Sequence, residues 1–165
     1  MFDTVLGIPV HPLVVHAVVV LGPLTALLLV IYAVVPRVRA GLRWPLLLLA
    51  LVSAGSAWVA QEAGEALMAM TYAPGFNHQE RGEMAWYALL ALLAATVVVV
   101  VLAPPRARDT YGASASGSAA RTGIAVVLAL AAAGFAVTTV VLAGHSGAES
   151  VWTPKIATVP TSEAT

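Results

Sequence analysis

Residues 13–35 read LVVHAVVVLGPLTALLLVIYAVV and contain no Asp, Glu, Lys or Arg. A run of about 20 apolar residues is the length that an α-helix needs to cross the hydrocarbon core of a bilayer. Three further, mostly apolar runs of similar length follow at about 45–68, 82–103 and 122–143. Because backbone groups in lipid must hydrogen bond within their own segment, all four runs are predicted to be helices, including those rich in valine.

The composition of the chain agrees with a membrane protein. Of the 165 residues, 60% are hydrophobic and 10% are charged, whereas about a quarter of the residues in a soluble domain are charged. The formal net charge is zero, which argues against the basic surface that nucleic-acid binding needs. The absence of cysteine excludes disulfides, thiolate metal sites and covalent haem attachment through a C-x-x-C-H motif.

The order of the runs predicts an all-α fold, an integral membrane four-helix up-down bundle that forms one domain over residues 1–152. The prolines agree with this division. Pro12 and Pro45 suit first helical turns, Pro36 follows a helix end, and Pro23 predicts a kink inside the first run. Residues 109–120 are predicted to be a linker of small residues, and residues 153–165 a disordered C-terminal tail.

The charged residues are divided between the two ends of the predicted bundle. The two loops that follow the first and third runs carry six arginines: Arg37, Arg39, Arg43, Arg106, Arg108 and Arg121. Seven acidic residues lie at the other end: Asp3, Glu62, Glu65, Glu80, Glu83, Glu149 and Glu163. Because cytoplasmic loops are enriched in arginine and lysine, both termini and the second loop are predicted to be extracytoplasmic.

All four histidines of the chain lie at this predicted extracytoplasmic end, at positions 11, 16, 78 and 145. Histidine is costly in lipid and binds metals and protons, so their common location predicts a functional site. A spacing of five residues places His11 and His16 on different faces of a helix. We expect His16 to face inward, and His11, held extended before the helix by Pro12, to cap the helix or meet lipid headgroups.

His145 is the strongest single ligand candidate, because two glycines flank it and Glu149 follows one helical turn later. One of these two glycines, Gly144, together with Gly55 and Gly82, leaves room for a flat ligand or for close helix packing. Glu62 and Glu65, at the end of the second run, suit metal ligands or partners of an imidazole N–H. The alternative for all these residues is structural, with solvated carboxylates and interfacial side chains.

Several of these features occur together and in order: GIPVHPLVVH at 7–16, the glycine-acidic end of the second run, His78, and GHSGAESVW at 144–152. In this combination the chain resembles the bacterial membrane family called domain of unknown function 2231, over residues 7–152. The resemblance implies a multi-pass protein of the bacterial inner membrane, with family histidines at His11, His16, His78 and His145. Many members carry a later histidine that this chain lacks. The family's activity is not established.

Two ligand sets follow from the sequence. A haem b site would use His16, His78 and His145 with Gly55, Gly82 and Gly144, by analogy with small membrane cytochromes. A zinc, iron or copper site would use His11, His16, Glu62, Glu65, His78, His145 and Glu149. The alternative function is a structural or assembly subunit of a larger membrane complex without a cofactor.

No catalytic residue is identified, and no independent enzymatic activity is expected. Transport ranks last because four helices are few for a transporter. The expected partner is the lipid bilayer, with other membrane subunits or a second copy of the chain left open, and no nucleic acid.

Overall fold

The computed structural model describes residues 4–5, 7–70, 77–105 and 119–157. It contains four long helices, α1 (Val10–Val34), α2 (Arg39–Met70), α3 (His78–Leu102) and α4 (Ala119–Ala157). A short 3₁₀ helix, η1 (Pro36–Val38), joins α1 to α2. Near the N-terminus, β1 (Thr4–Val5) and β2 (Ile8–Pro9) form a two-stranded antiparallel pair around Gly7, whose φ of 82° is a left-handed conformation that glycine adopts readily.

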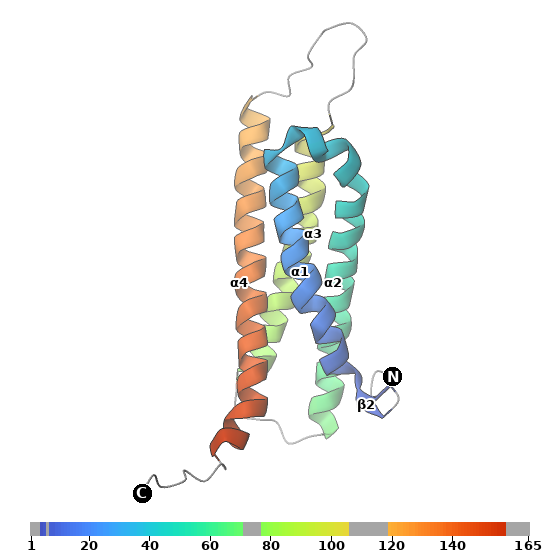
Figure 1. Cartoon of the computed structure of the whole chain (residues 1–165), viewed down its shortest axis with the longest axis vertical. Coiled ribbons are helices and arrows are strands. Elements are labelled where there is room, and N and C mark those ends of the chain that lie inside the picture. Colours follow the sequence, from blue (N-terminus) through green and yellow to red (C-terminus); the bar gives the residue numbers. More distant parts are fainter. Residues whose placement is uncertain (1–3, 6, 71–76, 106–118, 158–165) are drawn as a thin grey trace, which may run out of the picture.

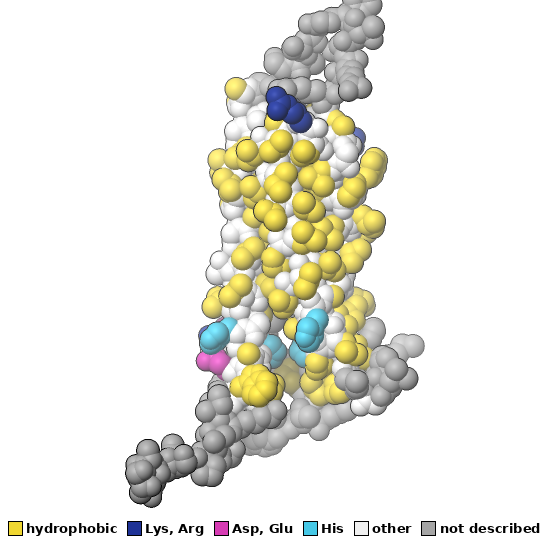
Figure 2. All heavy atoms as spheres, in the orientation of Figure 1, with side chains coloured by type: hydrophobic (Ala, Val, Ile, Leu, Met, Phe, Trp, Pro, Cys, Tyr) yellow, Lys and Arg dark blue, Asp and Glu magenta, His cyan; other side chains and the backbone are white. Residues whose placement is uncertain are grey.

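The structure confirms the all-α fold class, since each of the four helices is long and apolar enough to span a membrane. The helices run alternately up and down, so that α1 begins and α4 finishes at the same end of the bundle (Figure 1). We call this end, where α1 and α3 begin and α2 and α4 finish, the histidine end. The opposite end, which carries η1, is the arginine end. Figure 2 shows apolar side chains covering the length between them.

The helices extend beyond the predicted apolar runs at several boundaries, including the start of α3 at His78. α1 begins at Val10, α2 begins at Arg39 and therefore contains Pro45 in its interior, and α4 continues to Ala157. Residues 153–157 are thus helical where a disordered tail was predicted, because bilayer thickness sets the length of the apolar run and not that of the helix. The rest of the tail (158–165) and most of the predicted linker (109–118) lie outside the described residues.

Each helix packs along its two neighbours in a ring. α1 packs along α2 and α4, and α3 packs along the same two helices, while α1 and α3 touch only briefly across one diagonal of the bundle. The core residues are mainly alanine, as at Ala26, Ala88 and Ala129. Small side chains let helix backbones approach closely, and such packing holds helices together in lipid, where the hydrophobic effect between them is absent.

The two helical hairpins, α1–α2 and α3–α4, repeat the same pattern of buried positions. In α1 and α3, six buried residues follow His11 and His78 at identical spacings: Val18, Gly22, Thr25, Leu29, Tyr32 and Ala33, and Ala85, Leu89, Leu92, Thr96, Val99 and Val100. In α2 and α4 the matching buried residues are Leu46, Ala50, Ser53, Ala57 and Ala63, and Ala129, Ala133, Ala136, Val140 and Ser146. The hairpins are therefore related by an approximate two-fold rotation about the long axis of the bundle.

At the arginine end, Arg39 fixes the connection between α1 and α2. Its side chain is 5% exposed, and its guanidinium donates from Nε to the carbonyl of Tyr32 (3.0 Å) and from Nη2 to that of Ala33 (2.7 Å). The last carbonyls of a helix lack hydrogen-bond partners within the helix and carry partial negative charge. An arginine at this position donates hydrogen bonds to these carbonyls and also balances their charge. Arg39 also lies 5.9 Å from the centroid of the Tyr32 ring.

Candidate functional site

His11 lies in the first turn of α1, within the helix and facing the bundle. The prediction that Pro12 would hold it extended before the helix is wrong, because a proline in the first turn lacks only an N–H that would be unpaired there. The His11 ring reaches α2, where its Nδ1 lies 2.7 Å from the carbonyl oxygen of Ala60. A Cβ atom added to Gly64 would stand 3.0 Å from the same Nδ1, so the ring occupies space that this glycine leaves open.

His78 is the first residue of α3 and makes the corresponding contact with α4. Its Nδ1 lies 3.1 Å from the hydroxyl oxygen of Ser146, which is itself 1% exposed. The Ser146 hydroxyl donates to the carbonyl of Ala143 at 3.0 Å. A Cβ atom added to Gly147 would stand 3.0 Å from Cε1 of the His78 ring.

His11 and His78 therefore meet on the axis of the bundle. Their ring centroids are 5.9 Å apart with an interplanar angle of 79°, an edge-to-face contact between the diagonal helices α1 and α3. The approximate two-fold rotation that relates the hairpins also relates the two histidines, and it relates Gly64 to Gly147. Two imidazoles occupy one diagonal, and two glycines pack against them from the other.

The hydrogen bonds define which nitrogen of each ring carries the proton. A carbonyl oxygen only accepts, so Nδ1 of His11 donates to Ala60. The single proton of the Ser146 hydroxyl is directed to the carbonyl of Ala143, so the hydroxyl oxygen accepts from Nδ1 of His78. In their neutral forms both rings then carry the free lone pair on Nε2, the arrangement typical of histidines that bind metals.

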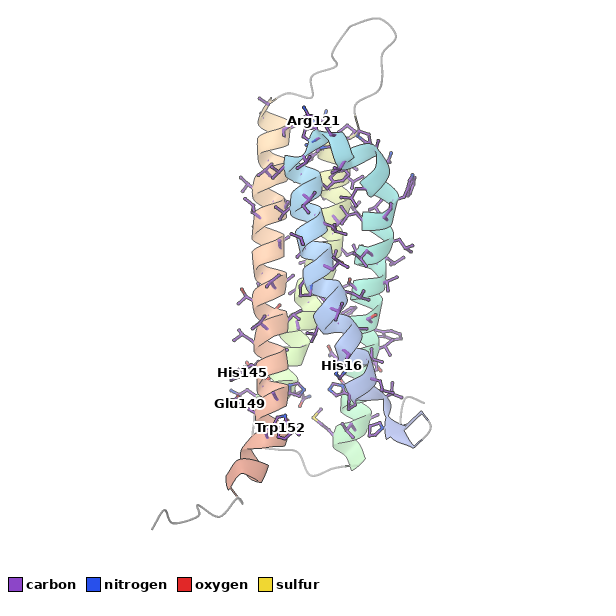
Figure 3. All side chains as sticks on the ribbon, in the orientation of Figure 1. His16, Arg121, His145, Glu149 and Trp152 are labelled. Carbon is purple, nitrogen blue, oxygen red and sulfur yellow. The ribbon has the colours of Figure 1, made fainter. Side chains whose placement is uncertain are left out.

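Two histidines of the predicted site lie outside this pair. The prediction that His16 faces inward is wrong: the ring is exposed, and its Nδ1 hydrogen bonds to the carbonyl of Pro12 in its own helix, at 2.5 Å. The side chain of His145 is 67% exposed and forms an ion-pair contact of 3.4 Å with Glu149, which is 46% exposed. Figure 3 shows His145 and Glu149 projecting from α4 away from the bundle.

The remaining predicted residues also stay apart from the histidine pair. Glu62 and Glu65 are exposed on α2. A Cβ atom added to Gly55, Gly82 or Gly144 would meet nothing within 4 Å, so none of these glycines admits a neighbouring helix closely. Among the residues that the structure describes, no group of three or more His, Cys, Asp or Glu side chains gathers as a metal site.

Of the residues that hold the two rings, Ala60, Gly64 and Ser146 were not predicted from the sequence, and Gly147 was assigned to His145 instead of His78. Their pattern is visible in retrospect, because Ala60 and Gly64, and likewise Ala143 and Gly147, are small residues spaced by four. Such pairs mark positions where membrane helices approach closely. Gly64 lies in the sequence between Glu62 and Glu65, the two carboxylates that were predicted to be ligands.

Comparison with known proteins identifies the family but not an activity. A family model described as a predicted membrane protein, DUF2231, matches residues 7–160. Neither the curated proteins nor the solved structures yield a match. The matched range contains all four spans, the histidine pair and the two glycines that hold it. The chain therefore belongs to the DUF2231 family of predicted membrane proteins.

Proposed function

We propose that this integral membrane protein holds one transition-metal centre between His11 and His78. The observation that carries the proposal is that the two rings face each other with their centroids 5.9 Å apart, while both Nδ1 atoms lie near protein acceptors at 2.7 and 3.1 Å, which leaves Nε2 as the candidate ligand atom of each ring. Metal-binding histidines commonly donate their second ring N–H to a carbonyl or another polar group, which fixes ring orientation and raises the basicity of the ligating nitrogen.

The separation of the rings agrees with a shared ion. Two nitrogen–metal bonds of about 2.0 Å put the centroids of two imidazoles about 5 to 6 Å apart, depending on the angle at the metal. The observed separation between His11 and His78 is 5.9 Å.

Two protein ligands make an open centre. A structural zinc site has four protein ligands, and a catalytic one keeps at least one position for water or substrate. With two imidazoles, further positions would be filled by water, a small ligand or another subunit. Imidazole suits zinc, copper and iron, so the ligands select this group of metals over magnesium or calcium.

The iron of a haem b is the second candidate, favoured by Gly64 and Gly147. A haem takes axial imidazoles from opposite sides, and its ring needs flanks without side chains. The two glycines lie on the other pair of helices, α2 and α4, and the imidazoles of His11 and His78 now fill the space that they leave. Binding of a haem would require the two hairpins to lie farther apart than binding of a single metal ion would.

Metal analysis and an absorption spectrum of untagged protein in detergent test the proposal. We expect about one metal per chain, lost in His11→Ala and in His78→Ala. The matched controls are His16→Ala and His145→Ala, which remove exposed imidazoles at the same end and should retain the metal. A Soret band would assign the metal to haem. Metal content that is equal in all four variants, or absent from the wild type, would overturn the proposal and favour an accessory subunit without a cofactor.

We infer that the histidine end faces the extracytoplasmic side of the bacterial inner membrane. The described arginines at the arginine end are Arg37, Arg39, Arg43 and Arg121, and cytoplasmic ends of membrane proteins carry such an excess. The chain lacks cysteine, so one introduced cysteine reports orientation by its labelling with an impermeant thiol reagent. Asn77→Cys should be labelled in intact cells, whereas Arg37→Cys should not.

A further inference from the structure

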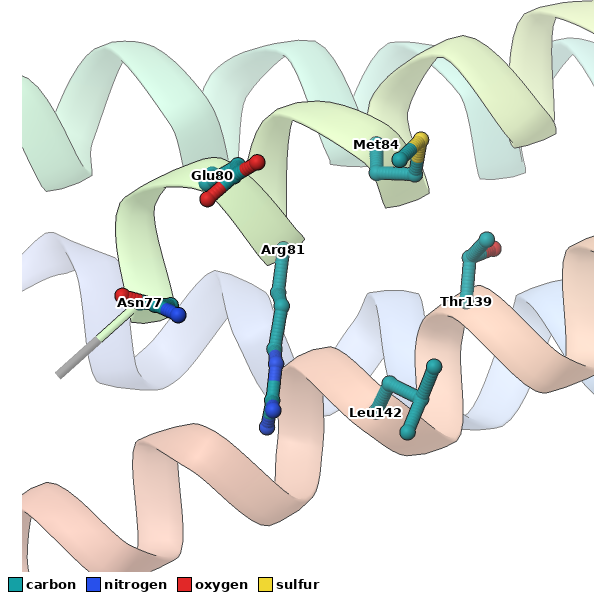
Figure 4. Close-up of a pocket in the computed structure, with 6 residues that line it drawn as sticks. All are labelled: Asn77, Glu80, Arg81, Met84, Thr139 and Leu142. Carbon is teal, nitrogen blue, oxygen red and sulfur yellow. The ribbon is translucent and has the colours of Figure 1, made fainter.

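A groove of about 220 Å³ runs between α3 and α4 at the histidine end, and neither His11 nor His78 lines it. It is lined by Asn77, Glu80, Arg81, Met84, Thr139 and Leu142. Figure 4 shows Arg81 extending from α3 toward α4 across the groove, with Asn77 and Glu80 at one end and Met84 and Thr139 at the other. The groove is thus polar near the start of α3 and apolar farther along the helices.

The polar end offers one positive and one negative side chain that do not neutralise each other. Arg81 is half-buried, and among the described residues no carboxylate forms an ion pair with it. The preceding residue, Glu80, is exposed. Its side chain leaves α3 in a different direction from that of Arg81. A ligand that carries both an anionic and a cationic group would satisfy both side chains.

At the apolar end, no side chain of the groove needs a polar partner from a ligand. Met84 and Leu142 are 49% and 46% exposed, and they face the region that lipid occupies. The hydroxyl of Thr139 already donates to carbonyls of its own helix, at Phe135 (3.0 Å) and Ala136 (3.1 Å). An acyl chain can therefore lie along this part of the groove without burying an unpaired polar group.

The groove also lies at one end of the candidate membrane span His78–Leu102, where the headgroups of a surrounding bilayer would be found. Asn77 precedes the first residue of α3, and Met84 lies two turns into the helix, so the groove extends about 10 Å along the axis. The headgroup and interfacial layer on each side of a bilayer is about 5 to 8 Å thick. The N-terminus of α3, with its partial positive charge, adds to the attraction for a phosphate near Arg81.

We propose that this groove binds a zwitterionic phospholipid. The phosphate lies at Arg81 and Asn77, the ammonium of the headgroup lies at Glu80, and an acyl chain covers Met84 and Leu142. This site shares no residue with the histidine pair, so it stands whether or not His11 and His78 bind a metal.

The test uses full-length protein in nanodiscs of equimolar phosphatidylethanolamine and phosphatidylglycerol, with retained lipid counted by native mass spectrometry. Wild-type protein should retain phosphatidylethanolamine in preference. Arg81→Gln should lower its retention roughly tenfold, which corresponds to one lost hydrogen bond between charged groups. Arg37→Gln is the matched control, because it removes an exposed arginine at the opposite end and should leave retention unchanged.

Glu80→Gln provides a test of headgroup selectivity. Without the carboxylate, the preference should move from phosphatidylethanolamine to phosphatidylglycerol, since only the phosphate contact remains. Leu142→Trp fills the apolar end without changing charge and should lower retention of both lipids, even if Arg81→Gln does not fold. Retention in Leu142→Trp equal to that in the wild type, or a wild-type preference for phosphatidylglycerol, would overturn the proposal.

Discussion

The ring of His78 lies so close to Gly147 that a Cβ atom on this glycine would stand 3.0 Å from Cε1 of the imidazole. The same relation holds between His11 and Gly64 in the other hairpin, where the closest ring atom is Nδ1 at 3.0 Å. Contacts shorter than 3.4 Å are rare for real Cβ atoms. Both rings are therefore positioned by the absence of a side chain on the facing helix.

Alanine at these two glycines should destabilise the protein through overcrowding. We expect Gly147→Ala and Gly64→Ala to lower the free energy of unfolding by about 1 to 3 kcal/mol. The controls are Gly144→Ala and Gly55→Ala, where an added Cβ meets nothing within 4 Å and the change should be neutral or stabilising by up to about 1 kcal/mol. Thermal unfolding in detergent measures the difference. Equal melting temperatures for Gly147→Ala and Gly144→Ala would contradict this account of the contact.

Removing the hydroxyl that accepts from His78 should weaken metal binding without removing a ligand. Ser146→Ala leaves Nδ1 of His78 without its 3.1 Å partner, and loss of such a partner typically lowers metal affinity ten- to a hundredfold, by about 1.4 to 2.7 kcal/mol. Ser150→Ala is the control on the same helix, because its hydroxyl donates to a carbonyl of its own helix, that of Gly147, at 2.7 Å. Titration with zinc in detergent measures both affinities. Identical affinities would show that Ser146 has no part in orienting the ring.

The connection at the arginine end should depend on Arg39 and not on Arg37. Arg39→Gln removes two bonds from a buried guanidinium to the carbonyls of Tyr32 and Ala33. Hydrogen bonds to charged groups contribute about 1.5 to 3 kcal/mol, so a loss of that order is expected. Arg37→Gln, at an exposed position two residues earlier, should change stability by less than about 0.5 kcal/mol. Unfolding by titration with SDS compares the two, and equal losses would be inconsistent with the proposed role of Arg39.

In the middle of the bundle, one hydrogen bond joins α1 to α2. The hydroxyl oxygens of Thr25 and Ser53 are 2.8 Å apart, and both residues are buried. Bonds of this kind between membrane helices average about 0.6 kcal/mol and reach about 1.7 kcal/mol. A double-mutant cycle with Thr25→Val and Ser53→Ala should give a coupling energy in that range. A coupling energy near zero would mean that each hydroxyl finds an equally good partner in its own helix.

Much of the fold follows from the sequence because a bilayer imposes constraints that act along the chain. The thickness of the hydrocarbon core sets the length of each apolar run, and the need to pair backbone groups makes each run helical. The same constraint places His11, His16, His78 and His145 at one end, as the structure confirms. Helix ends beyond the bilayer, as at Ala157, are not fixed in this way.

The rotation of each helix about its axis was not predictable in the same way. A helix that is apolar on all sides carries no hydrophobic stripe to show which face turns inward. The spacing of His11 and His16 correctly predicted that they face different directions, but not which one enters the bundle. His145 was favoured because Gly144 and Gly147 flank it in the sequence, but in the structure Gly147 makes room for the ring of His78.

The sequence alone determined four membrane-spanning helices, their alternating direction and the end at which the imidazoles lie, because those properties depend on apolar length and on residue order. The tertiary structure alone decided that His11 and His78 form the central pair and that His16 and His145 stay outside. In lipid, helices choose their contacting faces by how closely backbones approach. Gly64 and Gly147 therefore set the pairing, through contacts between residues far apart in the chain.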